Sequence, residues 1–495
     1  MIVLPREIDG YGPLKLPTGR LRPARRPSKL LADLDAALDA CEIRDGATVS
    51  FHHHLRNGDG VLNLVLDRLA ARGLKGLHVA ATSIFPVHAS LVGHIRSGTV
   101  TRLSANFISG PVGEAVSHGL LPHPVILRTH GGRARALDQG ELRVDVAFVA
   151  APAADDMGNI SGRIGPTACG TLGYPLTDVE VAQHVVAVTD TLVPFPAPSI
   201  DIPQGKVDYV VAVSSIGNPG GIASGTTRPA SDSVSTGIGN TAAAAIAASG
   251  VLVDGFSFQT GAGGVSLATA DAVGQIMAER GVTGSFAAGG ITGFHVRMLR
   301  DGLFRGLMDV QCFDLEAVES YKSDPRHQMM SAATYAGPHM GGAVVDRVDT
   351  VVLGAAEFDL SFNVNVTTKA GGIIIGGSGG HADTAAGASL TVVTTRLTAS
   401  GYAKIVPEVG TLTTPGSTVD LVVTEEGIAV NPLRPELAER LRAAGLNVTG
   451  IETLFDKAQG LAKVPTPPRS QGRVVAVSEY RDGSVTDVVR KIGAG

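Results

Sequence analysis

Two short stretches of this chain carry the residue types that acyl chemistry needs. Glu357 ends the apolar run "VDTVVLGAAE", and the glycine-rich segment "GGIIIGGSGGHAD" follows it. A glutamate has an unperturbed pKa of about 4.3, so its carboxylate is ionised at neutral pH and can attack a thioester. A loop containing Gly377, Gly379 and Gly380 can aim several backbone N–H groups at one oxygen. The pair predicts acyl transfer, with a structural ion pair at Glu357 as the open alternative.

A third stretch, "SFHHHLRNGDG" at residues 50–60, places three histidines before an arginine. If the strand runs through them, His52 and His54 share one face and His53 points to the other. Two histidines are fewer than the three or four ligands that zinc takes, and the cysteines have no CxxC or HExxH spacing. We expect no metal site, and histidines that face a substrate or satisfy buried polar groups.

The chain is internally repeated, and the repeat indicates which elements position these residues. "SFHHHLRNGDG" at 50 matches "SFQTGAGG" at 257, and a helical pattern follows each copy. "VDVAFVAAPAADDMGNISG" from 144 aligns with "VDTVVLGAAEFDLSFNVNV" from 348, which puts Ala153 opposite Glu357. Residues shared by two copies serve the fold, so this difference points to Glu357 as the residue that serves the chemistry.

Near-continuous apolar strands alternating with helical patterns predict an α/β fold with mainly parallel sheets. We expect two similar domains, 45–213 and 241–495, joined by a junction at 214–240 that is rich in Gly, Ser, Thr and Pro. Residues 1–44 are expected to hold a basic segment and a helix capped by Ser28. Near the C-terminus we expect two helices and a hairpin that turns at Asp482–Gly483.

Composition excludes several classes of function. A net charge of -5 over 495 residues argues against nucleic acid as the main partner. No apolar run reaches the roughly 18 residues of a membrane span, and "MIVLPREIDG" does not read as a signal peptide. Three scattered cysteines fit a reducing compartment, so the expected location is the cytoplasm.

Seven motifs in order carry a family resemblance over about residue 45 to the end: "SFHHHLRNGD", "HGGRARA", "GFSFQTGAGG", "LMDVQCFD", "FNVNV", "GGSGGHADTAAGA" and "VTEEGIAVNP". Together they resemble the alpha subunit of citrate lyase, within the wider CoA-transferase group that includes 4-hydroxybutyrate CoA-transferase. The resemblance implies two CoA-transferase-like domains, with Glu357 in the catalytic position. It also implies cofactor contacts at Gly377, Gly379 and Gly380 and, in the other glycine loop, at Gly261, Gly263 and Gly264.

The implied reaction exchanges acetate for citrate on a thioester. The thiol belongs to a phosphoribosyl-dephospho-CoA arm on the acyl carrier protein (gamma) subunit, with free acetyl-CoA as an alternative donor. A lyase (beta) subunit then cleaves the citryl thioester. The resemblance implies no permanently bound cofactor and assembly as an oligomer. It leaves open whether Glu357 forms an anhydride and a glutamyl thioester or whether citrate attacks the acetyl thioester directly.

Citrate carries three carboxylates, and arginine is the side chain best suited to bind a carboxylate at two points. We therefore predict a citrate clamp made of His52 or His54 with Arg56, aided by His130 and Arg133 of "HGGR". The alternative is that these groups only satisfy buried backbone at a domain interface.

The basic segment around Arg20, Arg22, Arg25, Arg26 and Lys29 is a solvated tail or a dock for the carrier protein. Residues 226–250 depart from the family pattern, of which only Arg228 remains, so carrier contacts there stay open. Other functions that the sequence allows are a CoA-transferase for citramalate or 4-hydroxybutyrate and a non-catalytic thioester-binding protein.

Overall fold

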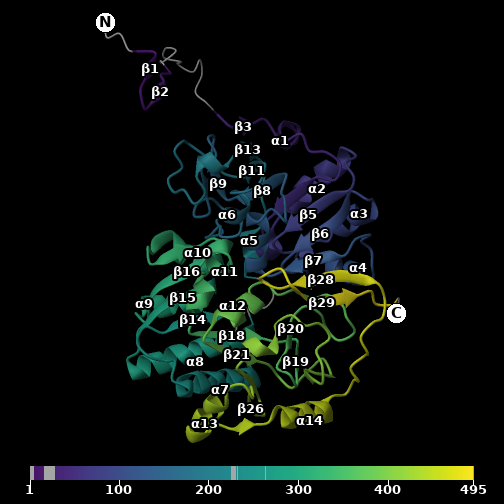
Figure 1. The fold of residues 1–495 in the computed structure, drawn as a ribbon, viewed down its shortest axis with the longest axis vertical. Helices are drawn as coiled ribbons and strands as arrows, with labels where there is room; N and C mark the ends of the chain where they lie inside the picture. The colour runs from purple at the N-terminus through teal and green to yellow at the C-terminus, as the bar shows by residue number, and fades with distance from the viewer. Residues whose placement is uncertain (1–4, 16–27, 224–229, 231, 262, 494–495) are drawn as a thin grey trace.

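The computed structural model describes residues 5–15, 28–223, 230, 232–261 and 263–493 (Figure 1). The basic residues Arg20, Arg22, Arg25, Arg26 and Arg228 lie outside this part of the chain. Within it, none of the helices combines the length and the apolar character that crossing a membrane requires.

Two large sheets form the two halves of the molecule. The first has the order β29-β28-β7-β6-β5-β4-β8-β11-β13-β3 and the second the order β17-β16-β15-β14-β18-β21-β25-β26-β27. The central strands of both are parallel and follow one order, since β7-β6-β5-β4-β8-β11-β13 corresponds to β17-β16-β15-β14-β18-β21-β25. The predicted α/β class with mainly parallel sheets is confirmed.

The strands of the first sheet are β3 (Leu30–Leu31), β4 (Thr48–Phe51), β5 (Leu77–Ala81), β6 (Val100–Ala105), β7 (Val125–Arg128), β8 (Val146–Ala151), β11 (His184–Thr189), β13 (Tyr209–Ala212), β28 (Val474–Glu479) and β29 (Val485–Arg490). Those of the second are β14 (Ser257–Thr260), β15 (Gly284–Ile291), β16 (Phe304–Cys312), β17 (His327–Met329), β18 (Thr350–Gly354), β21 (Leu390–Thr394), β25 (Leu421–Thr424), β26 (Gly427–Val430) and β27 (Val448–Thr449).

A small sheet accompanies each large one and repeats the same pattern. β9 (Ala153–Asp155) lies between β10 (Ile160–Ser161) and β12 (Leu192–Val193), as β19 (Glu357–Asp359) lies between β20 (Val364–Asn365) and β24 (Ile405–Val406). Ala153 and Glu357 therefore hold the same place in the two copies, as the sequence alignment predicts.

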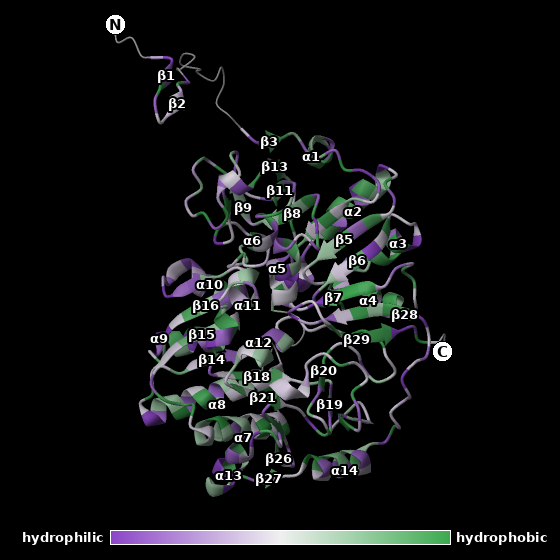
Figure 2. Ribbon diagram, in the orientation of Figure 1, coloured by the Kyte–Doolittle hydropathy of each residue, from purple (hydrophilic) through white to green (hydrophobic). Residues whose placement is uncertain are grey.

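Helices cover the sheets, and the local sequence accounts for their ends. α2 (Val61–Ala71) buries its apolar stripe, and α8 (Gly264–Arg280) ends where Gly281 takes a left-handed conformation. Figure 2 shows mostly hydrophobic strands under helices of mixed character. The remaining α-helices are α1 (Leu34–Ala40), α3 (Leu91–Arg96), α4 (Pro111–Ser117), α5 (His130–Asp138), α6 (Pro175–Asp178), α7 (Ser233–Ser249), α9 (Gly293–Arg300), α10 (Leu315–Ser323), α11 (Ala332–Ala336), α12 (His381–Gly387), α13 (Pro435–Ala443) and α14 (Ile451–Leu461).

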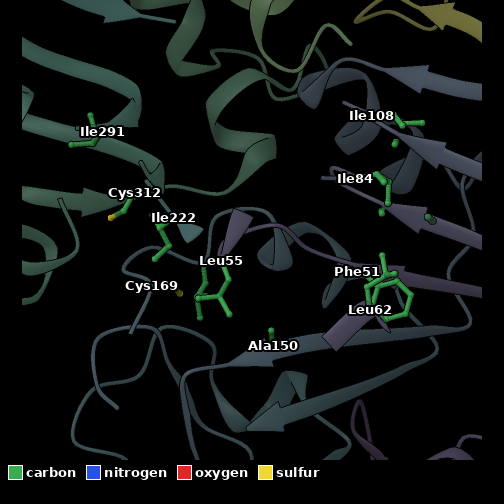
Figure 3. Packing of buried hydrophobic residues seen from close by; sticks show 14 of the residues in the cluster. Phe51, Leu55, Leu62, Ile84, Ile108, Ala150, Cys169, Ile222, Ile291 and Cys312 are labelled. Atoms are coloured by element: carbon green, nitrogen blue, oxygen red, sulfur yellow. The ribbon is translucent and has the colours of Figure 1, made fainter. Parts of the chain in front are cut away.

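The two halves meet through reciprocal loops. The Gly379 carbonyl accepts from His130 N at 2.8 Å, and the Gly173 carbonyl accepts from Ala332 N at 2.9 Å, so each half caps the start of a helix in the other. One hydrophobic cluster spans the interface between the two halves, with Cys312 near Ile222 and Cys169 (Figure 3). The carboxyl ends of several strands from both sheets consequently face one shared interface.

The N-terminal helix, the 214–240 segment and the C-terminal hairpin can be compared with their predictions. The helix predicted to start at Ser28 is wrong, because residues 30–31 pair with β13 and α1 starts later, capped by Asp33. The predicted 214–240 junction includes the start of α7. The hairpin turning at Asp482–Gly483 is present, but β28 pairs with β7 of the first sheet. The domain limits 45–213 and 241–495 stay a prediction. The hairpin lies within 241–495 in sequence but belongs to the sheet of the first half.

Candidate active site

Glu357 starts β19 directly after the end of β18, and it is 5% exposed. Its Oε2 accepts hydrogen bonds from Asn365 Nδ2 and from Gly410 N, both at 2.7 Å. No described residue donates to Oε1. Hydrogen bonds to an ionised oxygen are short and strong, so they fix the carboxylate and leave Oε1 as the oxygen available for chemistry.

Asn365 is oriented by its own surroundings. Its Nδ2 donates to the Thr368 carbonyl at 3.0 Å, while its Oδ1 accepts from Thr367 N at 2.9 Å. Because a carbonyl can only accept, these bonds decide which end of the amide faces Glu357. Asn365 is fully buried, which holds the donor in place before any substrate arrives.

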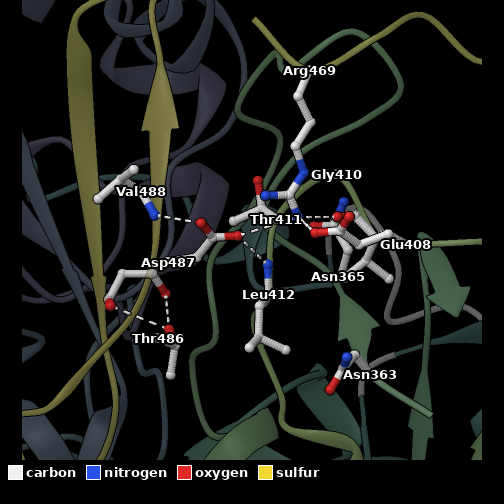
Figure 4. A network of polar contacts seen from close by, with 12 residues as sticks. Asn363, Asn365, Glu408, Gly410, Thr411, Leu412, Arg469, Thr486, Asp487 and Val488 are labelled. Carbon is white, nitrogen blue, oxygen red and sulfur yellow. Dashed lines mark hydrogen bonds and ion pairs between the residues drawn. The ribbon is translucent and has the colours of Figure 1, made fainter. Parts of the chain in front are cut away.

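The Gly410 segment is held from the other side by the C-terminal hairpin (Figure 4). Leu412 N donates to Asp487 Oδ2 at 2.8 Å, and Arg469 lies 3.3 Å from Glu408 and 3.6 Å from Asp487. A strand of the first sheet thus fixes a loop of the second half.

The glycine loop lies between the two halves. Gly376 N donates to Thr367 O at 3.1 Å, and the Gly376 carbonyl accepts from Ile108 N at 3.1 Å. A Cβ at Gly377 would collide with the Asn106 carbonyl, and Gly379 has φ +51°, so both positions need glycine. The loop therefore connects the backbone beside Asn365 to the strand ends of the first half.

Three backbone N–H groups of this loop are free to bind a ligand. The N–H groups of Gly377, Ser378 and Gly380 have no hydrogen-bond acceptor among the described residues. Adjacent amides of this kind suit an oxygen that becomes negative during acyl transfer.

Arg56 is the clamp residue with the most unusual environment. It is 7% exposed, has a positive φ of 51°, and lies with its guanidinium 5.2 Å from the Phe85 ring and 4.7 Å from the Phe313 ring. Burial lowers its pKa to about 10. No acidic side chain of the described chain forms an ion pair with it. A buried, strained and uncompensated cation between the halves suits an anionic ligand.

Arg133, His54 and His130 already have hydrogen-bond partners, whereas His52 only lies near a carboxylate. Asp178 lies 2.5 Å from Arg133 Nη2 and 3.4 Å from His52 Nε2. His54 Nε2 donates to the Ala150 carbonyl at 2.6 Å, and His130 Nε2 lies 2.9 Å from the Tyr174 hydroxyl.

Two of these histidines are neutral. Burial lowers the pKa of His54 to about 4 and that of His130 to about 3. Each keeps a buried Nδ1 without a partner among the described residues. The prediction that His52 and His54 share a strand face is wrong, because β4 ends at Phe51 and the three histidines lie in the loop beyond it.

Gly261, Gly263 and Gly264 connect β14 to α8. Gly261 N donates to the Val352 carbonyl of β18 at 2.7 Å, so this turn lies at the same sheet edge as Glu357. Gly263 and Gly264 begin a long helix, where backbone N–H groups favour an anion.

Sequence reasoning gave no role to several residues of the site. Asn365 and Asp383 occur inside the quoted motifs, but spacing alone assigned them nothing. Asp383 accepts from Thr129 Oγ1 at 2.8 Å and from Gly131 N at 3.0 Å, and burial raises its pKa to about 6. Gly410 lies in a stretch without any pattern, and only the fold brings it to Glu357.

One group of metal-type ligands occurs in the described chain. Asp309, Cys312 and His327 are buried with their ligand atoms within 4.8 Å of one another. Asp309 Oδ2 lies 3.0 Å from both Cys312 Sγ and His327 Nε2, so the three side chains satisfy one another by hydrogen bonding.

Comparison with known proteins identifies the family of this chain. The family model described as "Citrate lyase, alpha subunit (CitF)" matches residues 27–492. The citrate lyase alpha chain of Escherichia coli (strain K12) is 44% identical over 467 residues, 94% of this chain and 92% of its own length. A crystal structure of a citrate lyase alpha subunit from Streptococcus mutans in complex with citrate has a TM-score of 0.92 and 43% identity, covering 96% of this chain and 93% of that one.

A more distant match shows the fold alone. 4-Hydroxybutyrate CoA-transferase from Porphyromonas gingivalis has a TM-score of 0.56 at 19% identity, over 87% of this chain and 97% of that one. With the family model and the close relatives in agreement over nearly the whole length, the chain belongs to the citrate lyase alpha subunit family.

Proposed function

We propose that this protein is the transferase of a citrate lyase, which exchanges acetate for citrate on an acyl-carrier-protein thioester. The observation that carries the proposal is Glu357, held through Oε2 and free of described donors at Oε1. The close relatives are named citrate lyase alpha chains, and one was crystallised with citrate. The carrier and lyase subunits are the proposed partners, with the phosphoribosyl-dephospho-CoA arm as the thiol.

Glu357 is the proposed nucleophile. Oε1 attacks the acetyl carbonyl, the C–S bond breaks, and an acetyl-glutamyl anhydride and a thiolate form. The thiolate then attacks the glutamyl carbonyl, which releases acetate and leaves a glutamyl thioester. A citrate carboxylate attacks the glutamyl carbonyl, which breaks the C–S bond, releases the thiolate and gives a citryl-glutamyl anhydride. The thiolate then attacks the citryl carbonyl, which breaks the anhydride C–O bond and gives the citryl thioester and the free Glu357 carboxylate. The N–H groups of Gly377, Ser378 and Gly380 are suited to the oxyanions of these steps.

Arg56 is the proposed primary contact for citrate. Its guanidinium has no described acid partner, while Arg133 is already paired with Asp178. His54 Nε2 donates to a carbonyl, so the unpartnered Nδ1 of His54 is an acceptor for a substrate hydroxyl or protonated carboxyl group. The unpartnered Nδ1 of His130 is a second polar atom open to the substrate. In this arrangement Arg133 supports the clamp through Asp178, and His52, which lies 3.4 Å from the same carboxylate, keeps an unpartnered Nδ1 like those of His54 and His130.

The test is thioester exchange from acetyl-CoA to citrate, citramalate or 4-hydroxybutyrate by the purified protein. Glu357→Gln should lose at least about 1,000-fold in kcat, because the amide is not a nucleophile. Glu439→Gln, at an exposed site of α13, is the matched control and should behave like the wild type. Preference for citramalate or 4-hydroxybutyrate over citrate would replace the proposed substrate.

Mass analysis of the peptide that contains Glu357 distinguishes the two mechanisms. After incubation with acetyl-CoA, the covalent route leaves a CoA adduct on Glu357, which disappears on addition of citrate. Citryl-CoA formation with no adduct at any time would favour direct attack by citrate, with Glu357 as an electrostatic group.

A further inference from the structure

Lys404 directly precedes β24, the strand that pairs with the strand of Glu357. β24 pairs in parallel with β19, with Phe358 opposite Ile405, and Phe358 N donates to the Lys404 carbonyl at 2.8 Å. The register therefore places Lys404 opposite Glu357. Side chains at paired positions of parallel strands project to the same face. Phe358 and Ile405 share one hydrophobic cluster, so Glu357 and Lys404 project to the opposite face.

The ammonium group of Lys404 has no hydrogen bond or ion pair with any residue that the structure describes. Three charged groups act on it from separate elements: Glu425 after β25, Arg396 after β21, and Glu357 on β19. Burial lowers the pKa of Lys404 to about 8, against the raising effect of the two glutamates.

The two other charged groups that act on Lys404 are hydrogen-bonded to other residues. Both carboxylate oxygens of Glu425 accept from Leu397 N at 3.1 Å, and Arg396 bonds to Asp232 and to Ser235 Oγ. Glu357 uses only Oε2, with two neutral donors. The register thus places the positive charge of Lys404 and the free Oε1 of Glu357 on one face of the small sheet, without an ion pair between them.

We propose that Lys404 is a positioning residue, whose ammonium turns the free oxygen of Glu357 toward the thioester and balances its negative charge. This inference rests on the proposed role of Glu357. Once Glu357 carries an acyl group its own charge is gone, and the ammonium then faces the thiolate that must attack in the next step. The same cation therefore serves both directions of the exchange.

The experiment compares Lys404→Met, Lys404→Arg and the matched control Lys457→Met in acetyl-CoA and citrate exchange across pH 6 to 10. Lys457 lies on α14, half exposed and paired with Glu426. We expect kcat of Lys404→Met to fall at least about 10-fold with the citrate KM within about 2-fold, and Lys404→Arg to recover most of the rate. The wild-type rate should decline above about pH 8, and Lys404→Arg should extend activity to higher pH because arginine stays charged.

Each other outcome overturns the inference. A Lys404→Met rate within about 2-fold of the wild type at every pH would show that the charge is not used. Equal losses in Lys404→Met and Lys404→Arg with one unchanged pH profile would indicate packing alone. Glu357→Gln is assayed in parallel: if it keeps full activity, the proposed function fails, whereas an inactive Glu357→Gln beside unaffected Lys404 variants refutes only the role of Lys404.

Discussion

Replacing Arg56 by methionine should change stability and citrate binding in opposite directions. Burial lowers the pKa of Arg56 from 12.5 to about 10, so keeping the guanidinium charged in the folded protein costs on the order of 3 kcal/mol. This cost applies at every pH below about 10, since the side chain is protonated in both the folded and unfolded chain there. Contacts with the Phe85 and Phe313 rings offset about 1 to 2 kcal/mol of it.

Methionine keeps much of the apolar stem and removes the charge. The free energy of unfolding of Arg56→Met should therefore rise by about 1 to 2 kcal/mol in the absence of citrate. Loss of two charge-assisted hydrogen bonds to a carboxylate should weaken citrate binding by about 3 kcal/mol, or roughly 100-fold in Kd. The site is thus built at the expense of the stability of the empty protein.

Urea unfolding and calorimetric titration with citrate measure the two effects on the same samples. The control is Arg96→Met, an exposed residue in the last turn of α3, which should leave both quantities unchanged. A variant that is less stable than the wild type yet binds citrate with the same Kd would refute the reasoning, because Arg56 would then be a packing residue.

Two further substitutions test the surroundings of Glu357 and the contact between the two halves at Asp383. Asn365→Ala removes a hydrogen bond of 2.7 Å to Glu357 and should lower kcat about 10- to 100-fold with little change in citrate KM. The control Asn363→Ala, two residues away, should keep the wild-type kcat. Equal kcat values in both variants would contradict the role of Asn365. Burial raises the pKa of Asp383 from 3.8 to about 6, so its stabilising effect is present below pH 3.8 and is lost as pH rises through 6. Relative to Asp383→Asn, the wild type should lose on the order of 3 kcal/mol between pH 4 and pH 7.5, measured by urea unfolding at several pH values, and parallel curves for the two proteins would refute it.

The sequence predicts the architecture well because the chain contains two copies of the same order of strands and helices. Apolar strands and helical stripes recur in order in both copies, so each assignment supports its counterpart, and the alignment of Ala153 with Glu357 is an identity of position in the structure. The sequence does not show the pairing partners of the two terminal segments. Residues 30–31 of the expected helix form a strand that pairs with β13, and the predicted hairpin pairs with β7 of the first sheet. Both outcomes depend on contacts far along the chain, which local patterns do not encode.

The sequence predicts only part of the site for the same reason. Glu357 and the glycine loop stand out in the sequence by residue type and spacing. Gly410 and Lys404 reach Glu357 only through strand pairing and a loop fixed by distant side chains. The sequence also does not show which clamp arginine is already paired: Asp178 pairs with Arg133, and no described acid pairs with Arg56.

The place of β28 beside β7 has a consequence for synthesis on the ribosome. β7 is complete at Arg128, but its partner strand begins at Val474, which at 5 to 20 residues per second delays pairing by roughly 20 to 70 s. Until then the outer edge of β7 presents open backbone groups that can pair with other chains. Asp487 arrives with the same hairpin, so a nascent chain already holding every catalytic motif still lacks the anchor of the Gly410 segment. Synthesis of the β28–β29 hairpin therefore closes the sheet of one half and fixes the Gly410 segment of the other.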